Sequence, residues 1–122
     1  MLLLCCEYHD ILILKIKERT VKPLDNRTDY NGQAAMMKAL SNPIRLQIVH
    51  QLLRSGCHNV TCMEQGTGMS QSCVSQHLQK LRAAGLVTAR RSGNQVYYRA
   101  ASEEVARLIA ALFQEEASDY VL

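Results

Sequence analysis

The stretch Ser70–Val87, which reads SQSCVSQHLQKLRAAGLV, decides the fold of this chain. Its first serine can cap a helix by accepting from a first-turn amide, and Gly85 suits the left-handed turn that ends one. Between them Val74, Leu78 and Leu81 recur at helical spacing and predict a buried face. The opposite face carries hydroxyl and amide groups, on Gln71, Ser72, Ser75, Gln76 and Gln79. Such groups suit either the reading of base edges in a DNA major groove or ordinary solvation.

A β-hairpin is expected directly after this helix. Leu86–Arg91 and Gln95–Ala100 are rich in branched and aromatic residues, and Gly93 and Asn94 between them tolerate a tight turn. No Asp or Glu occurs from residue 65 to residue 102, a window that holds Lys80, Arg82, Arg90, Arg91 and Arg99. A basic hairpin beside a polar helix face is typical of proteins that bind duplex DNA, in which phosphate contacts give affinity and base contacts give specificity.

Helix caps and apolar periodicity predict the other elements. Thr28 or Asp29 can cap a helix that ends near Leu40, and Asn42 with Pro43 at the first helical position starts the next. A short helix over Val60–Gly66 is expected to be the first of a helix-turn-helix pair. Ser102 caps the last helix, whose apolar stripe suits a dimer interface, although packing on its own core can take half of it. That stripe consists of Val105, Leu108, Ile109, Leu112 and Phe113.

Three motifs in this order resemble the ArsR-type (ArsR/SmtB) family of winged helix-turn-helix repressors. They are ALSNPIRL at residues 39–46, SCVSQHL at 72–78 with AGLV at 84–87, and RSGNQVYYR at 91–99, and the resemblance covers about residues 29–116. It implies a mainly α fold with a small β-hairpin, in the order α-α-α-α-β-β-α. It further implies a homodimer on an inverted-repeat operator in double-stranded DNA, with the matched helix in the major groove. Repression would be relieved by an effector.

The predicted DNA-binding residues follow from the polar face and from the basic hairpin. Base contacts are expected from Gln71, Ser72, Ser75 and Gln76. Phosphate or wing contacts are expected from Ser70, Lys80, Arg90, Arg91 and Asn94.

Length and composition predict one small domain. The chain has 122 residues, of which 48% are hydrophobic and only 5% aromatic, so aliphatic helices must provide most of the core. We expect an N-terminal extension and linker at residues 1–28, the DNA-binding and dimerisation domain at 29–117, and a tail at 118–122. The apolar runs Leu2–Cys6 and Ile11–Ile16 are shorter than a membrane span and lack the flanks of a signal peptide, so no membrane association and a cytoplasmic location are expected.

Five cysteines make the inducer the open question. Without an export signal, Cys5, Cys6, Cys57, Cys62 and Cys73 argue for a reducing compartment rather than a disulfide framework. Three interpretations stand: Cys5 and Cys6 join Cys57 or Cys62 of a partner subunit in a site for arsenite or a soft metal; Cys62 and Cys73 form an oxidation switch; or all five are inert. No cofactor is required by the sequence. The CxC and last-helix metal sites of the resembling family are not matched.

Two alternatives to DNA binding fit the sequence less well. An enzyme is not expected, because nothing marks a carboxylate partner or a substrate pocket for the adjacent Cys57 and His58. A winged-helix module that binds protein would have a hydrophobic or acidic reading face. Of the other histidines, His77 is expected to pack between helices and His50 to be exposed, while His58 is expected in a turn with a modest claim as a ligand.

Overall fold

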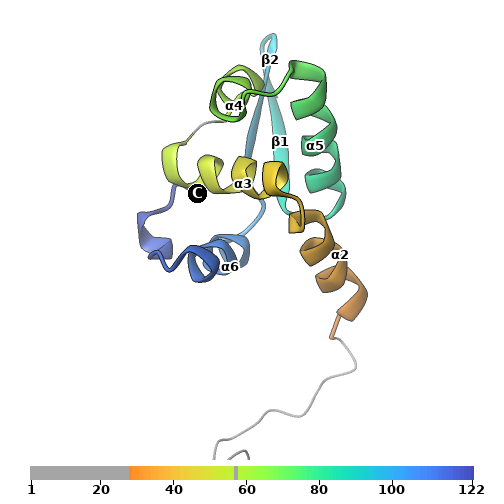
Figure 1. The fold of residues 1–122 in the computed structure, drawn as a ribbon, viewed down its shortest axis with the longest axis vertical. Coiled ribbons are helices and arrows are strands. Elements are labelled where there is room, and N and C mark those ends of the chain that lie inside the picture. The colour runs from red at the N-terminus through yellow and green to blue at the C-terminus, as the bar shows by residue number, and fades with distance from the viewer. Residues whose placement is uncertain (1–27, 57) are drawn as a thin grey trace, which may run out of the picture.

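The structure, a computed structural model, describes residues 28–56 and 58–122. Within these ranges the order is helices, hairpin, helix, as predicted for a winged helix-turn-helix (Figure 1). The helices before the hairpin are α2 (Tyr30–Leu40), α3 (Pro43–Ser55), α4 (Val60–Thr67) and α5 (Gln71–Ala83). The hairpin consists of β1 (Val87–Ser92) and β2 (Gln95–Ala100), and α6 (Glu103–Phe113) and a 3-10 turn (Ala117–Asp119) follow. None of the helices in the described part of the chain is long and apolar enough to cross a membrane.

The predicted caps form as hydrogen bonds to first-turn amides. Asp29, rather than Thr28, accepts from Gly32 N at 2.8 Å, and Asn42 Oδ1 accepts from the first turn of α3 at 2.9 and 3.1 Å. Ser70 and Ser102 cap α5 and α6 in the same way. These side chains satisfy amides that no intrahelical carbonyl can reach, which fixes where each helix begins.

The core surrounds α3. Its stripe of Ile48, Val49, Leu52 and Leu53 is fully buried. Helices α4, α5 and α6, β1 and the turn before β1 contribute the remaining large buried side chains, which are Met63, Val74, Leu78, Leu81, Leu86, Val87, Val105 and Ile109. Each fully buried aliphatic side chain contributes about 1.5–3 kcal/mol of transfer free energy, so one shared core holds all the elements together.

Helix α4, the first of the helix-turn-helix pair, packs against α3. The Gln47 side-chain amide donates to Gly66 O at 3.0 Å. A Cβ at Gly66 would lie 2.6 Å from the amide oxygen of Gln51, so a larger residue there would displace the flexible end of that side chain. Gly68, with φ of 71°, ends α4 and turns the chain towards α5.

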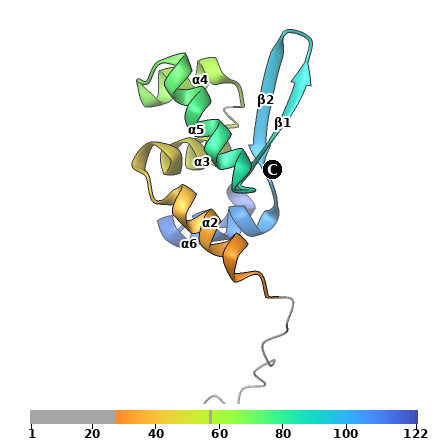
Figure 2. The ribbon, with the colours of Figure 1, turned by 90° about the vertical axis from the view of Figure 1, so that its right-hand side faces the viewer.

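The two ends of the molecule carry different elements. The hairpin tip, α4 and the start of α5 lie at one end, and α2 and α6 lie at the other (Figures 1 and 2). The last-helix stripe divides as expected: Val105 and Ile109 are buried, whereas Leu112 is 53% and Phe113 39% exposed. On α2, Tyr30 and Met37 are also exposed. A partly apolar surface is therefore present at the end away from the hairpin tip.

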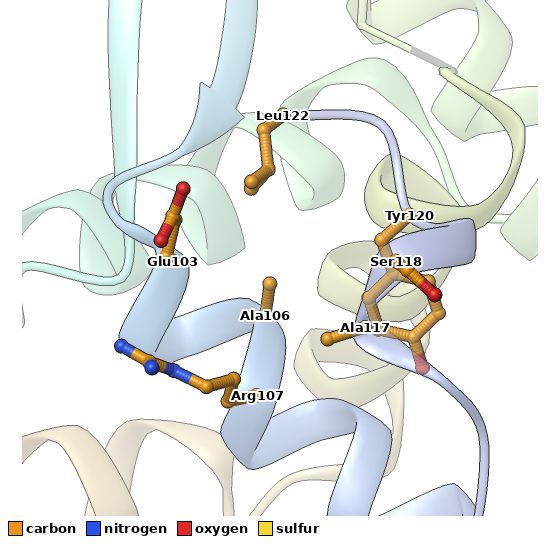
Figure 3. A pocket seen from close by; sticks show the side chains of 7 residues that line it. All are labelled: Glu103, Ala106, Arg107, Ala117, Ser118, Tyr120 and Leu122. Atoms are coloured by element: carbon orange, nitrogen blue, oxygen red, sulfur yellow. The ribbon is translucent and has the colours of Figure 1, made fainter.

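The segment after α6 returns to α3. Val121 N donates to Leu53 O at 2.7 Å, and Glu115 accepts from Tyr120 Oη at 2.8 Å and from Arg54 at 3.1 Å. Burial, and then the hydrogen bond to the Glu115 carboxylate, raise the pKa of Tyr120 to about 12. Between this segment and α6 lies a pocket of about 300 Å³, with Ala106 at its centre in Figure 3 and with Glu103 and Tyr120 among its lining residues.

The expectation that His50 is exposed was wrong. Its ring stacks on Phe113, with centroids 3.9 Å apart, and its Nε2 lies 3.2 Å from Glu115 Oε2. Only 20% of the side chain is exposed. The sequence places His50 beside the apolar stripe of α3, but only the return of the C-terminal segment covers it.

The expected interhelix role of His77 is confirmed. Arg45 joins three helices: its Nε donates to Ala39 O at the end of α2 at 2.6 Å, and its guanidinium lies 3.4 Å from His77 Nδ1 on α5. Because arginine only donates, His77 accepts here as the neutral imidazole with its proton on Nε2. Burial first, and then the charges of Arg45 and Lys80, lower the pKa of His77.

This lowered pKa predicts an acid-sensitive fold. His77 has its ordinary pKa of about 6.5 in the unfolded chain and a lower pKa in the folded protein. The stability that the neutral ring contributes is therefore present above about pH 6.5 and is lost as the pH falls from there through the folded pKa. We expect the free energy of unfolding, measured in urea between about pH 7.5 and pH 5, to fall less steeply with acid in His77→Gln than in the wild type. Comparing pH slopes removes any constant cost of the substitution, and identical slopes would contradict the assignment.

Candidate nucleic-acid interface

The core presents the polar face of α5 to solvent. Val74, Leu78 and Leu81 are fully buried beneath the helix. On the other side Gln71, Ser72, Gln76 and Gln79 are exposed, and Ser75 is half-buried. The face predicted to read bases is thus accessible along its length.

A hollow of about 340 Å³ lies where α5, the start of α4 and the hairpin meet. It brings together three residues that the sequence predicted as DNA contacts: Gln71 and Ser75 from α5 and Asn94 from the hairpin turn. Asn59, Thr61 and Gln95 also line it and escaped the sequence prediction. Asn59 and Thr61 precede α5 by a whole helix, so only the packing of α4 on α5 brings them here. The hollow has polar side chains on three sides.

The two arginines at the hairpin tip lie on opposite faces. In the antiparallel register Arg90 pairs with Tyr97 and Arg91 pairs with Val96. Because side chains alternate along a strand, Arg90 shares a face with Thr88, and both line a second hollow of about 340 Å³ that Ser92, Tyr97 and Arg99 complete. Arg91 shares its face with Tyr98, which packs on the core. These neighbouring arginines therefore point to different places, and the register shows that Arg90 faces the second hollow while Arg91 shares the face of Tyr98.

The remaining predicted contacts lie outside both hollows. Ser70 Oγ accepts from Cys73 N at 3.3 Å and lies 3.4 Å from Ser72 Oγ. This hydroxyl therefore caps α5, the helix predicted to contact bases, hereafter the reading helix. Gln76 lies one turn after Ser72 on α5. Lys80 lies in the last turn and is exposed.

The charge on this side of the molecule is positive and unneutralised. Ion pairs within residues 28–56 and 58–122 join His50 and Arg54 to Glu115, and Arg107 to Glu104. None of them involves the five basic residues of the acid-free window, Lys80, Arg82, Arg90, Arg91 and Arg99. Their charges remain available for phosphates, whose counterions are released on contact.

Two of the predicted sensor thiols fall in the described residues. Cys62, half-buried on α4, is disulfide-bonded, whereas Cys73 in the first turn of α5 is a free thiol, so the two are not joined to each other. Cys5, Cys6 and Cys57 lie outside the described residues. Among the residues that are described, no group of three or more His, Cys, Asp or Glu side chains is placed to hold a metal ion.

Comparison with known proteins agrees with this geometry. Residues 42–89 match the bacterial regulatory protein, arsR family. Nodulation protein NolR of Rhizobium meliloti is 37% identical over 78% of this chain and 79% of its own length. The chain belongs to the arsR family. A biofilm growth-associated repressor of Xylella fastidiosa is 33% identical over 84% of this chain and 91% of that protein.

One similar solved structure also shows how a relative assembles. It is the homodimeric winged helix-turn-helix DNA-binding domain of a possible ArsR-family transcriptional regulator from Mycobacterium bovis. At 37% identity it covers 75% of this chain and 88% of its own, with a TM-score of 0.63. The winged helix-turn-helix fold and the family resemblance predicted from the sequence are confirmed, and this arsR-family chain is a winged-helix transcriptional repressor.

Gln76→Ala is expected to relax sequence specificity. Gln76 is exposed on the reading face, and a bidentate amide contact to a base discriminates by about 1–3 kcal/mol. Binding to a set of operators with single-base changes should become nearly uniform at one position, while affinity for non-specific DNA stays constant. Gln79→Ala, one turn further from the start of α5, is the matched control and should keep the wild-type preferences. Unaltered discrimination in Gln76→Ala would remove Gln76 from the base contacts.

Arg91→Ala is expected to weaken binding to all DNA alike. A lost phosphate contact reduces the slope of log K against log salt by about one. The slope should be measured by titrations at several salt concentrations. Arg107→Ala, which removes an exposed arginine from α6 at the other end of the molecule, is the control and should keep the wild-type slope. A wild-type slope in Arg91→Ala would exclude Arg91 from the phosphate contacts.

Proposed function

We propose that this arsR-family chain acts as a homodimer on an inverted-repeat operator, with α5 in the major groove and the hairpin against the backbone. Its role is regulatory rather than catalytic. The observation that carries the proposal is the hollow at the hairpin, where Gln71 and Ser75 of the reading helix and Asn94 of the wing line one concave polar surface. An acid-free basic segment surrounds this surface, which suits a polyanion.

The dimer is proposed to form through α2 and α6. Tyr30, Met37, Leu112 and Phe113 are large apolar side chains that a lone subunit leaves exposed. They lie on the two helices at the end away from the hairpin tip, so a two-fold axis there leaves both reading helices free (Figure 1). A two-fold dimer requires a palindromic site. The homodimeric Mycobacterium bovis relative supports this arrangement.

The signal that releases DNA is proposed to be thiol oxidation. Cys62 N donates to Oδ1 of the capping Asn59 at 2.8 Å, and its sulfur, which is disulfide-bonded in this structure, lies on a helix that packs against the reading helix. Cys73 lies in the first turn of the reading helix itself. A chemical change at either sulfur would alter the reading helix itself or the helix packed against it. A soft metal or arsenite at the cysteines is the alternative signal, because thiolates are soft ligands.

Oxidation is expected to release the protein from DNA. We expect the affinity for a fragment from upstream of its own gene, measured by fluorescence anisotropy, to fall by about tenfold or more after mild oxidation. Reductant should restore it. The measurement is made metal-free, and Cys62→Ser and Cys73→Ser are tested in parallel to locate the responsive sulfur.

Each outcome of this titration separates the parts of the proposal. Equal affinity in both redox states, with salt-sensitive binding intact, would contradict the thiol signal, and arsenite or a soft metal would then be titrated. Absence of salt-sensitive binding on this fragment and on DNA selected from random sequence would contradict DNA binding altogether. A winged-helix module that binds protein would then be the better description.

A further inference from the structure

Within the described residues, the strands of the hairpin are hydrogen-bonded to the body of the protein at one residue, Tyr98. Among the hydrogen bonds between described residues, two join the strands of the hairpin to another element, and both involve His58 and Tyr98. Tyr98 N donates to His58 O at 2.7 Å, and His58 Nδ1 lies 2.9 Å from Tyr98 O. Since a carbonyl only accepts, the His58 ring donates and carries its proton on Nδ1. A single residue thus satisfies both main-chain groups of Tyr98 on the outer edge of β2.

The position of Tyr98 makes this contact decisive for the wing. Tyr98 pairs with Ala89 in the middle of the hairpin, and its half-buried side chain packs on the core. On the side of this point away from the tip, Val87 and the half-buried Ala100 hold the strands to the core. On the tip side, every residue from Arg90 to Tyr97 is exposed. The contact with His58 is therefore the last attachment before the tip projects into solvent, as Figure 2 shows for the hairpin as a whole.

The His58 side chain lies close to the end of α3. Gly56 has φ of 65°, and a Cβ there would lie 3.3 Å from His58 Nε2, so the imidazole lies close against the glycine. Asn59, the next residue, caps α4. The ring therefore lies between the end of α3 and the start of α4, and its Nδ1 reaches Tyr98 O on β2.

We infer that His58 is a positioning residue for DNA binding: through Tyr98 it sets the distance between the wing and the reading helix. This inference rests on the proposed function. Tyr98, Asn94 and Gln95 line the same hollow as Gln71 and Ser75, so a wing that moves away from the body widens that hollow. His58 touches no DNA in this arrangement. It holds the wing where its basic residues meet the phosphates.

The test compares His58→Leu with His58→Asn. Leucine keeps bulk and removes the donor, whereas the asparagine side chain carries an amide nitrogen on the carbon that corresponds to Cγ of histidine and can restore the bond to Tyr98 O. The first measurement is amide hydrogen exchange of Tyr98 in the protein without DNA. The expected result is an acceleration of roughly two- to tenfold in His58→Leu, the range that corresponds to one net hydrogen bond, with recovery in His58→Asn.

The second measurement is DNA binding as a function of salt. His58→Leu should lose about one unit of salt slope, as Arg91→Ala does, while it keeps the wild-type order of preference among operator variants. His58→Asn should restore the slope. If His58 only stabilised the fold, its replacement by leucine would lower the urea midpoint of unfolding without changing the salt slope. The urea midpoint of each variant is therefore measured alongside.

The outcomes separate this inference from the function on which it rests. Unchanged Tyr98 exchange or an unchanged salt slope in His58→Leu, with the wild type binding normally, would overturn the positioning role alone. A wild-type protein that binds no DNA would overturn the proposed function, and the role of His58 in DNA binding with it. Faster exchange together with a lower slope, both rescued by asparagine, would establish it.

Discussion

The burial of the α3 stripe is the constraint on which the rest of the structure depends. Ile48, Val49, Leu52 and Leu53 are fully excluded from water, and no single neighbour can cover them. The other helices and the first strand each give part of their apolar surface to this stripe. In a chain with no tryptophan and one phenylalanine, such shared aliphatic burial is the principal source of stability available. The position of the reading helix is fixed because its buried face packs into this core.

The separation of the two ends follows from the same packing. An α3 helix at the centre leaves α4, α5 and the hairpin tip on one side and α2 and α6 on the other (Figure 1). Arg45 links these sides, since it bonds to the end of α2 and approaches His77 on α5. Apolar exposure collects at one end and unpaired basic charge at the other. Subunit association and DNA binding thus occupy different surfaces of one small domain.

The hairpin is bound to this core much less tightly than the helices are. Its base is buried, its middle is held through Tyr98, and its tip is exposed on both faces. A projecting, weakly attached element can follow a DNA backbone, but its position then depends on few contacts. This is the physical reason why a histidine outside the helix-turn-helix pair and outside the wing gains importance for both.

The sequence alone determined the order of the elements, the caps and the family, because these depend on local spacing. Asn42 before Pro43, Ser70 before an apolar period, and Gly93-Asn94 between two branched segments act within a few residues of themselves. The predicted DNA contacts remain predictions, although Gln71, Ser75 and Asn94 do meet in one hollow. Only the tertiary structure decided that Arg91 rather than Arg90 shares the face of Tyr98, that His50 is covered by Phe113, and that His58 reaches Tyr98. These facts depend on strand register and on contacts between residues 40 to 65 positions apart, for which a single sequence carries no local signal.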